Sequence, residues 1–284
     1  MEDWLCIQAQ DTAVSWDNVI QTHYPAYWPD WSIPERHLSA LRERWNYQAA
    51  AEAFDWMPYL SKDSMTVLDL GAGTGWLSAM LSLLPGIGHI DALDSSKFNL
   101  EFMMPRVVAL LGASMAKIHP IRGLFTPILK PNDHYDLIVA SSAFHHASDL
   151  LHLLKECHRV LKPGAKAVIL NETPMSRYAY IRLGSRMFVS LIKGVLQSRF
   201  VDRAPTISLF GVKYDPYLGD VAYADYHWRQ AIEAAGFEFE RIDSGISPYR
   251  PHADNPTNAG HLVHFVCRKR HVKNSSEKTR GNGV

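Results

Sequence analysis

Three glycines at alternate positions follow an apolar run and an acid in the stretch VLDLGAGTG, residues 67–75. Gly71, Gly73 and Gly75 lack side chains, so the backbone can turn tightly there and a ligand can lie against it. The stretch WLSAML that follows has helical periodicity. This pattern predicts a ligand site at the carboxyl end of a strand, which is where doubly wound sheets bind ligands.

Two adjacent histidines follow a second apolar run in YDLIVASSAFHH. Imidazole gains and loses a proton near neutral pH, so His145 or His146 is a candidate general base. The alternative is that one ring only caps the following helix. Glu172, which ends the run AKAVILNE, is a further candidate for the acceptor side, although a solvated or helix-capping carboxylate is the favoured alternative.

Composition and charge exclude several classes of protein. Lysine plus arginine equals aspartate plus glutamate at 29 each, so no overall charge favours nucleic acid or an anionic membrane. The three cysteines form no CxxC pair, and we predict neither a disulfide framework nor a metal site. No signal-like segment and no membrane-spanning apolar run is evident, so we expect a cytoplasmic protein.

The elements that must position these residues alternate between strand-like and helical patterns from 65 to 171. Continuous apolar runs such as VLDL and DLIVA are typical of strands covered on both faces. The sequence therefore predicts an α/β fold with a doubly wound, mostly parallel sheet of seven strands. Residues 237–243 and 261–270 are expected to pair antiparallel, which makes the last strand antiparallel.

The rest of the chain divides around that core, which we expect at 61–172 and 228–271. Residues 1–60 form an aromatic-rich helical cap with one long helix from Ser32 to about Asp55. Residues 173–227 form an inserted lid or substrate region, and 272–284 a disordered tail. From these parts we single out Tyr24, Trp28 and Arg177 as candidate acceptor contacts. The alternatives are ordinary helix packing for the two rings and a solvated lid helix for Arg177.

The glycine turn resembles the first motif of the class I S-adenosylmethionine-dependent methyltransferases, a hydrophobic strand followed by D-x-G-x-G-x-G. Asp94 at the end of HIDALD, the strand YDLIVAS and the turn LKPGAKAVILNE follow in the family's order. The resemblance extends from about Met65 to Arg270. It implies a Rossmann-like methyltransferase fold, S-adenosylmethionine as cofactor and a small-molecule acceptor.

The resemblance also implies roles for individual residues. Asp94 matches the acid that accepts both ribose hydroxyls, with Ser95 or Ser96 nearby. One position departs from the family, because Leu124 stands where an acid often binds the adenine amino group, and packing by this leucine is the expected substitute. The implied cofactor contacts are Asp69, Gly71, Ala72, Gly73, Gly75, Asp94, Ser95, Leu124 and Ser141.

Two other functions remain open on sequence grounds. A nicotinamide-dependent oxidoreductase would use a G-x-G-x-x-G turn, but Trp76 stands at its third glycine. A methyltransferase-fold protein that binds without catalysis is also compatible with the motifs. Nucleic-acid methylation is disfavoured, since SSAF replaces the family's N-P-P-[YF]. The sequence does not determine the methylated atom or the oligomeric state, and a homodimer stays open.

Overall fold

The computed structural model describes residues 1–8, 16–60, 62–147, 149–178, 181–182, 184–185, 207–208, 211–213, 220–248 and 260–270. The predicted disordered tail at 272–284 and most of the predicted insertion at 173–227 lie outside these ranges, so both remain predictions.

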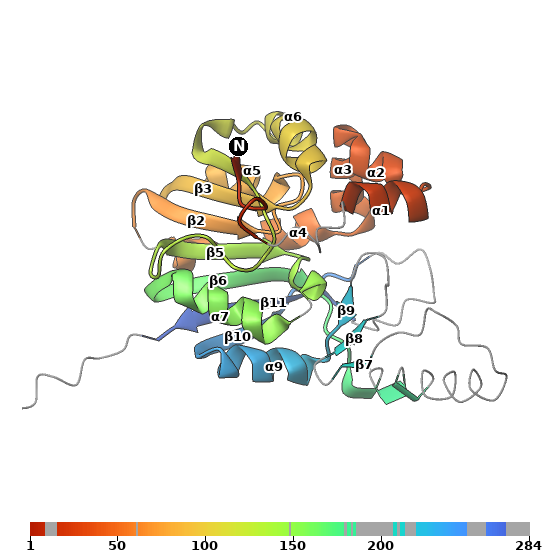
Figure 1. Cartoon of the computed structure of the whole chain (residues 1–284), viewed down its shortest axis with the longest axis vertical. Helices are drawn as coiled ribbons and strands as arrows, with labels where there is room; N and C mark the ends of the chain where they lie inside the picture. The colour runs from red at the N-terminus through yellow and green to blue at the C-terminus, as the bar shows by residue number, and fades with distance from the viewer. Residues whose placement is uncertain are drawn as a thin grey trace, which may run out of the picture.

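A single large sheet organises the described part of the chain, with the strand order β1-β4-β3-β2-β5-β6-β11-β10 (Figure 1). Strand β11 is antiparallel to both of its neighbours, and the remaining neighbours are parallel. The prediction of a doubly wound, mostly parallel sheet with an antiparallel last strand is confirmed. The strands are β1 (Glu2–Asp3), β2 (Met65–Leu70), β3 (Ile87–Asp94), β4 (Ile118–Arg122), β5 (Tyr135–Ser141), β6 (Leu161–Glu172), β10 (Phe237–Asp243) and β11 (Val263–Lys269).

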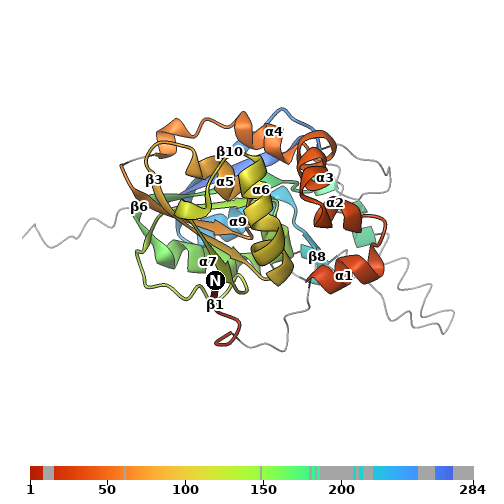
Figure 2. The ribbon, with the colours of Figure 1, turned by 90° about the horizontal axis from the view of Figure 1, so that it is seen from above.

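Successive side chains of the central strands enter two different hydrophobic clusters. In β2, Val67 joins the cluster beneath α5 and α6, whereas Leu68 and Leu70 join the cluster beneath α7 and α9. Both faces are therefore covered, which explains the continuous apolar runs in the sequence. Figures 1 and 2 show these helix pairs on opposite faces of the sheet. The four helices are α5 (Trp76–Ser82), α6 (Met104–Leu110), α7 (Leu150–Val160) and α9 (Asp225–Ala234).

The N-terminal residues depart from the prediction in two ways. Residues 1–8 belong to the sheet edge, because β1 pairs with β4 and Trp4 is buried in the core beside it. The single long helix is wrong, since the chain breaks at Asn46, which has a left-handed φ of 58°. Ser32 ends a helix instead of capping one. The segments are α1 (Trp16–His23), α2 (Trp28–Ser32), α3 (Pro34–Ser39), the π-helix η2 (Ala40–Arg44), α4 (Tyr47–Glu52) and η3 (Met57–Tyr59).

Three further short helical segments of the described residues connect the core elements. They are the π-helix η4 (Asn99–Met103) before α6, and the 3-10 helices η5 (Met115–Lys117) and η6 (Phe144–His146). The predicted helix at about 97–111 is thus a π turn that continues into α6. Within the described residues, no helix is long and apolar enough to cross a bilayer.

A second, three-stranded sheet lies beyond one edge of the large sheet, in the order β7-β8-β9. Helices α1–α3 lie beyond the same edge, on the right in Figures 1 and 2. This edge is the one at which the carboxyl end of β5 lies, and η6 follows β5 there. The strands of the small sheet are β7 (Ile207–Ser208), β8 (Gly211–Lys213) and β9 (Val221–Ala222).

Candidate active site

The glycine turn and the histidine segment meet where the strand order reverses. β2 and β5 are neighbours, while the chain continues from β2 to β3 on one side and from β5 to β6 on the other. The turn is fixed to β3 because the N–H groups of Gly71 and Ala72 both donate to the Leu93 carbonyl oxygen at 2.9 Å. Such a switch point is the ligand-binding position of doubly wound sheets.

The three glycines of the turn all have positive φ but meet different surroundings. A Cβ atom on Gly71 would lie 2.7 Å from the Ala143 Cβ, and one on Gly75 would lie 2.6 Å from the Met104 side chain. A Cβ on Gly73 would meet no atom within 4 Å. Gly71 and Gly75 therefore allow close protein packing, and Gly73 is the glycine that faces open space.

Asp94 lies beside the open glycine, at the end of β3. Its Oδ2 accepts a hydrogen bond from the Gly73 N–H at 2.8 Å, and its Oδ1 accepts one from the Ser96 N–H at 2.8 Å. A carboxylate has about four acceptor sites, so two backbone donors leave capacity for a ligand. Ser96 is buried and its hydroxyl accepts from the Asn99 N–H, whereas Ser95 is half-buried. Ser95 is thus better placed for a ligand than Ser96.

Asp69 lies below the turn and not on its surface. Its side chain is buried and accepts a 2.6 Å hydrogen bond from the Ser78 hydroxyl. Ser78 is in the first turn of α5, whose N-cap Gly75 has no side chain to serve as a cap. Burial, together with the nearby charge of Asp94, raises the pKa of Asp69 to about 7, although the hydrogen bond from Ser78 opposes this rise. Asp69 therefore positions α5 against the glycine turn.

Leu124 follows β4 at the place where an adenine contact was expected. Its peptide is held by the buried side chain of Gln8: Oε1 accepts from the Leu124 N–H at 2.7 Å, and Nε2 donates to the Leu124 carbonyl at 3.1 Å. Nε2 also donates to the Pro127 carbonyl at 2.8 Å. The Gln8 side chain thus fixes the position of the segment from Leu124 to Pro127. The sequence alone gave no indication of this contact.

Ser141 ends β5 and belongs to a polar group that reaches into the N-terminal helices. Its hydroxyl accepts from Asn171 Nδ2 at 2.8 Å, and the same amide donates to the Tyr47 carbonyl at 3.0 Å. The Tyr47 hydroxyl bonds to Ser142; burial raises the pKa of Tyr47. Helix α4 is thereby joined to the carboxyl ends of β5 and β6.

Glu172, at the end of β6, holds the histidine segment in place. One carboxylate oxygen accepts from the N–H groups of Ala143 at 3.1 Å and Phe144 at 2.9 Å, and the other lies 3.1 Å from His145 Nδ1. The side chain is only 1% exposed. The structure therefore favours the capping role of Glu172 over direct contact with an acceptor.

The two histidines each face an acid from a different segment. His145 faces Glu172, while His146 Nδ1 lies 2.6 Å from Asp220 Oδ1, just before β9. The centroids of the two imidazole rings are 4.2 Å apart. Burial lowers the pKa of His145, but the charge of Glu172, the hydrogen bond to it and the charge of Asp220 outweigh this and raise the pKa above its usual value.

The remaining predicted acceptor contacts lie apart from this group. The Trp28 ring packs against Phe98 at 5.4 Å between centroids, and Tyr24 is half-buried in the loop before α2. Arg177 is exposed near the end of a described stretch. No described contact joins Trp28 or Arg177 to His145 or His146.

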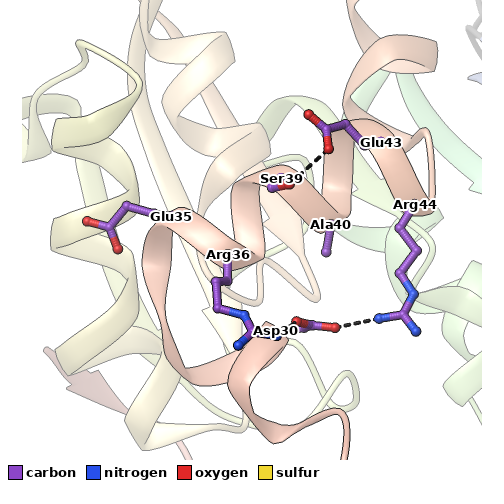
Figure 3. A pocket seen from close by; sticks show the side chains of 7 residues that line it. All are labelled: Asp30, Glu35, Arg36, Ser39, Ala40, Glu43 and Arg44. Carbon is purple, nitrogen blue, oxygen red and sulfur yellow. Dashed lines mark hydrogen bonds and ion pairs between the residues drawn. The ribbon is translucent and has the colours of Figure 1, made fainter.

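An open pocket of about 530 Å³ lies among α2, α3 and η2 (Figure 3). It is lined by Asp30, Glu35, Arg36, Ser39, Ala40, Glu43 and Arg44. Figure 3 shows Arg36 and Arg44 on opposite sides of Asp30. Asp30 forms ion pairs with both arginines, at 3.0 Å to Arg36. The pocket shares no residue with the glycine turn or the histidine group.

Comparisons with known proteins agree with this geometry. The methyltransferase domain family matches residues 67–164, from the glycine turn to the start of β6. The ubiquinone/menaquinone biosynthesis C-methyltransferase UbiE of Vibrio vulnificus is 30% identical over 113 residues, which are 39% of this chain and 42% of that protein. The demethylmenaquinone methyltransferase of Bacillus licheniformis is 26% identical over 188 residues, covering 58% of this chain and 79% of that protein.

A similar fold occurs in a solved structure, a proposed sarcosine dimethylglycine methyltransferase of Galdieria sulphuraria. The TM-score is 0.54 at 18% identity, covering 83% of this chain and 88% of the other. The chain spans less than half the length of the UbiE relative. The matched residues, the strand order and the motif sequence together show that this chain contains a class I methyltransferase domain.

Proposed function

We propose that this protein binds S-adenosylmethionine in the crevice between β2 and β5 and transfers a methyl group to a small-molecule acceptor. The observation that carries the proposal is the pairing of Asp94 with Gly73. The carboxylate lies 2.8 Å from the N–H of the one glycine in the turn that faces open space. The Asp94 carboxylate can accept hydrogen bonds from ribose hydroxyls, and the open backbone at Gly73 leaves room for the cationic amino acid end of the same ligand.

The residues around the crevice fit this cofactor in distinct ways. Asp94 with Ser95 would receive the ribose, and the backbone at Gly71, Ala72 and Gly73 would lie against the methionine end. Asp69 supports the turn through Ser78. Leu124, whose peptide is held by Gln8, would form an apolar wall for the adenine. Ser141, near the histidines, would stand between cofactor and acceptor.

S-adenosylmethionine supplies a methyl group on a positively charged sulfur. A lone pair of the acceptor forms the new bond to the methyl carbon while the electron pair of the carbon–sulfur bond returns to sulfur. An acceptor that carries a proton must also lose it. His145 and His146 follow β5, and 25% or less of each side chain is exposed. One of these imidazoles would act as the general base that takes the proton from the acceptor.

Features of the acceptor follow from what surrounds the histidines. The predicted lid at 173–227 contributes Asp220, which contacts His146. Two relatives are named for quinone methylation, and a quinone precursor is a ring with a polar edge. An aromatic acceptor with a proton-bearing group fits a site bordered by Tyr47. Arg177, predicted from the sequence to contact the acceptor, would pair with an anionic substituent on it.

The alternative functions have less support. A nicotinamide dinucleotide would require the third glycine of its fingerprint, but Trp76 is the first residue of α5 and is buried in the core. A non-catalytic binding protein would need no acidic partners for His145 and His146. Both histidines have such partners.

Calorimetric titration with S-adenosylmethionine, S-adenosylhomocysteine and NAD⁺ tests the proposal. We expect binding of the first two at about micromolar Kd and no binding of the dinucleotide. Binding of NAD⁺ alone would contradict the assignment of the glycine turn. Binding of S-adenosylmethionine without turnover of any phenol, carboxylate or amine would support the non-catalytic alternative.

A further inference from the structure

Three side chains of metal-binding type converge at the carboxyl edge of β5. The ligand atoms of His145, His146 and Asp220 all lie within 4.8 Å of one another, although Asp220 comes from a separate segment. We propose that these three side chains bind one divalent transition-metal ion. The sequence predicted no metal site because the three residues share no metal-binding spacing, and only folding brings Asp220 to the histidines.

The position of Glu172 is an independent reason for this proposal. A histidine that binds a metal usually donates its other ring N–H to a carboxylate, which fixes the tautomer and the ring orientation. His145 Nδ1 lies 3.1 Å from Glu172 Oε2, and a carboxylate accepts only, so Nδ1 carries the proton. The lone pair of Nε2 is then available to an ion. Glu172 is itself held by the Ala143 and Phe144 N–H groups.

The ligand set also indicates the kind of ion. Two imidazoles and one carboxylate suit zinc, iron, cobalt or nickel better than magnesium or calcium, which prefer oxygen ligands. Three protein ligands leave positions for a substrate or water, as in catalytic metal sites. The side chains of His145, His146 and Asp220 are 23%, 25% and 13% exposed, so an ion can reach them from solvent.

The separation between His146 and Asp220 sets a condition on binding. Their facing atoms are 2.6 Å apart, whereas two ligands of one tetrahedral ion with bonds of about 2.0–2.1 Å are about 3.3 Å apart. The Asp220 side chain must therefore move slightly outward to admit an ion. An ordinary ion pair between His146 and Asp220 is the competing explanation, and the experiment below separates the two.

This inference rests on the proposed function for its consequence, which concerns the class of acceptor. An ion at the histidine pair would bind a hydroxyl oxygen of the acceptor and lower the pKa of that hydroxyl. The hydroxyl proton would pass to solvent, and the oxygen lone pair would form the bond to the methyl carbon as the carbon–sulfur bond breaks. The histidines would then act as ligands, and the acceptor would be a hydroxylated compound.

The test uses the full chain, freed of metal with a chelator and then desalted. Calorimetric titration with Co²⁺ and the visible absorption of the bound ion report binding without any need for activity. We expect one ion per chain with a Kd of about micromolar or tighter. His146→Ala and Asp220→Asn should each weaken binding at least ~10-fold. Asp220→Asn keeps the shape of the side chain, and thermal melting checks that both variants are folded.

Two further variants make the result specific. His119→Ala removes an exposed histidine that also pairs with an acid, Glu2, at 3.5 Å, and it should leave Co²⁺ binding unchanged. Glu172→Gln should weaken binding ~10-fold or more, because the carboxylate that orients the His145 ring is lost while the three ligands remain. The metal proposal is overturned if wild type binds no Co²⁺, or if His146→Ala and Asp220→Asn bind it as wild type does.

The outcomes separate this inference from the proposed function. If wild type binds S-adenosylmethionine but no Co²⁺, the cofactor site stands, the metal proposal is wrong, and His146–Asp220 is an ion pair. If wild type binds one Co²⁺ through these residues but no S-adenosylmethionine, the metal site stands and the proposed methyl transfer is wrong.

Discussion

The two sides of the crevice between β2 and β5 are built differently. On the cofactor side, Asp94 and Gly73 belong to consecutive strand–turn units, and the contact between them joins neighbouring strands. On the acceptor side, His146 meets Asp220 from beyond the core, and Asn171 meets Tyr47 from the N-terminal helices. The pairing of Asp94 with Gly73 is therefore local, whereas the acceptor side is assembled from distant segments.

This difference indicates how each side of the crevice should respond to substitution. A local turn is determined by backbone conformation and tolerates little change. A site assembled from separate segments changes when any contributing segment changes, so one fold accommodates many acceptors. Substitutions on the cofactor side should therefore affect cofactor binding and stability, and substitutions on the acceptor side should affect turnover alone.

The largest effect is expected from Gly71→Ala. The added methyl group would lie 2.7 Å from the Ala143 Cβ, in a residue with a φ of 77°. Steric overlap and left-handed strain together should lower the free energy of unfolding by about 2–4 kcal/mol and abolish cofactor binding. Gly73→Ala is the matched control, since its methyl group meets open space, and it should cost about 1 kcal/mol. Equal melting temperatures for the two variants would refute this distinction.

A large effect on affinity is expected from Asp94→Asn. The amide keeps one oxygen acceptor but loses the charge, so S-adenosylmethionine should bind ~10–100-fold more weakly by calorimetry. Asp136→Asn is the control, because Asp136 lies near the amino end of β5, away from the crevice, and pairs with Lys62 and Lys162. The control should bind the cofactor as wild type does. Unchanged affinity in Asp94→Asn would exclude Asp94 from the cofactor site.

An intermediate effect on stability is expected from the titration of Asp69. Its pKa is raised to about 7 by burial, so between about pH 4 and pH 7 the folded state keeps a proton that the unfolded state has lost. The free energy of unfolding of wild type should therefore fall as the pH rises through this range. Asp69→Asn lacks this titration and should gain about 1–3 kcal/mol relative to wild type between pH 5 and pH 8.

Chemical denaturation at several pH values measures this gain. Ser78→Ala serves as a control, because it removes the hydrogen bond to Asp69 but leaves the carboxyl group to titrate. A parallel pH dependence in wild type and Asp69→Asn would show that Asp69 ionises normally.

The smallest effect is expected on the acceptor side, from Tyr47→Phe. The change removes the hydroxyl that bonds to Ser142 and leaves the ring in place. Turnover should fall a few-fold, in line with the loss of about 0.5–1 kcal/mol, while the affinity for S-adenosylmethionine stays constant. Tyr59→Phe, whose ring stacks on Phe54 at 5.2 Å, should change neither quantity. A loss of cofactor affinity in Tyr47→Phe would mean that the two sides are not separate.

Local sequence patterns predicted the core of the fold well. Strands β2 and β5 match the predicted apolar runs, and α7 has Cys157 buried as expected from its helical spacing. The N-terminal helix was predicted wrongly because apolar spacing does not reveal a left-handed residue, and Asn46 interrupts the chain. The edge strand β1 was missed because two residues give no periodicity.

The same limit applies to the site. The resemblance to the methyltransferase family predicted that Asp94 and the glycine turn share the cofactor site. The contact of Gln8 with Leu124 and that of His146 with Asp220 join residues far apart in the chain, for which no local pattern exists. Glu172 was identified as a candidate, but only its three hydrogen-bond partners distinguish positioning from substrate contact.

A crystal structure of the complex with S-adenosylhomocysteine would test the central claim most directly. We predict that the ribose hydroxyls lie within hydrogen-bond distance of the Asp94 carboxylate and that the amino acid end lies over Gly73. The sulfur atom would then face the segment that carries His145 and His146. A ligand bound away from Asp94, for example in the charged pocket around Asp30, would contradict the account.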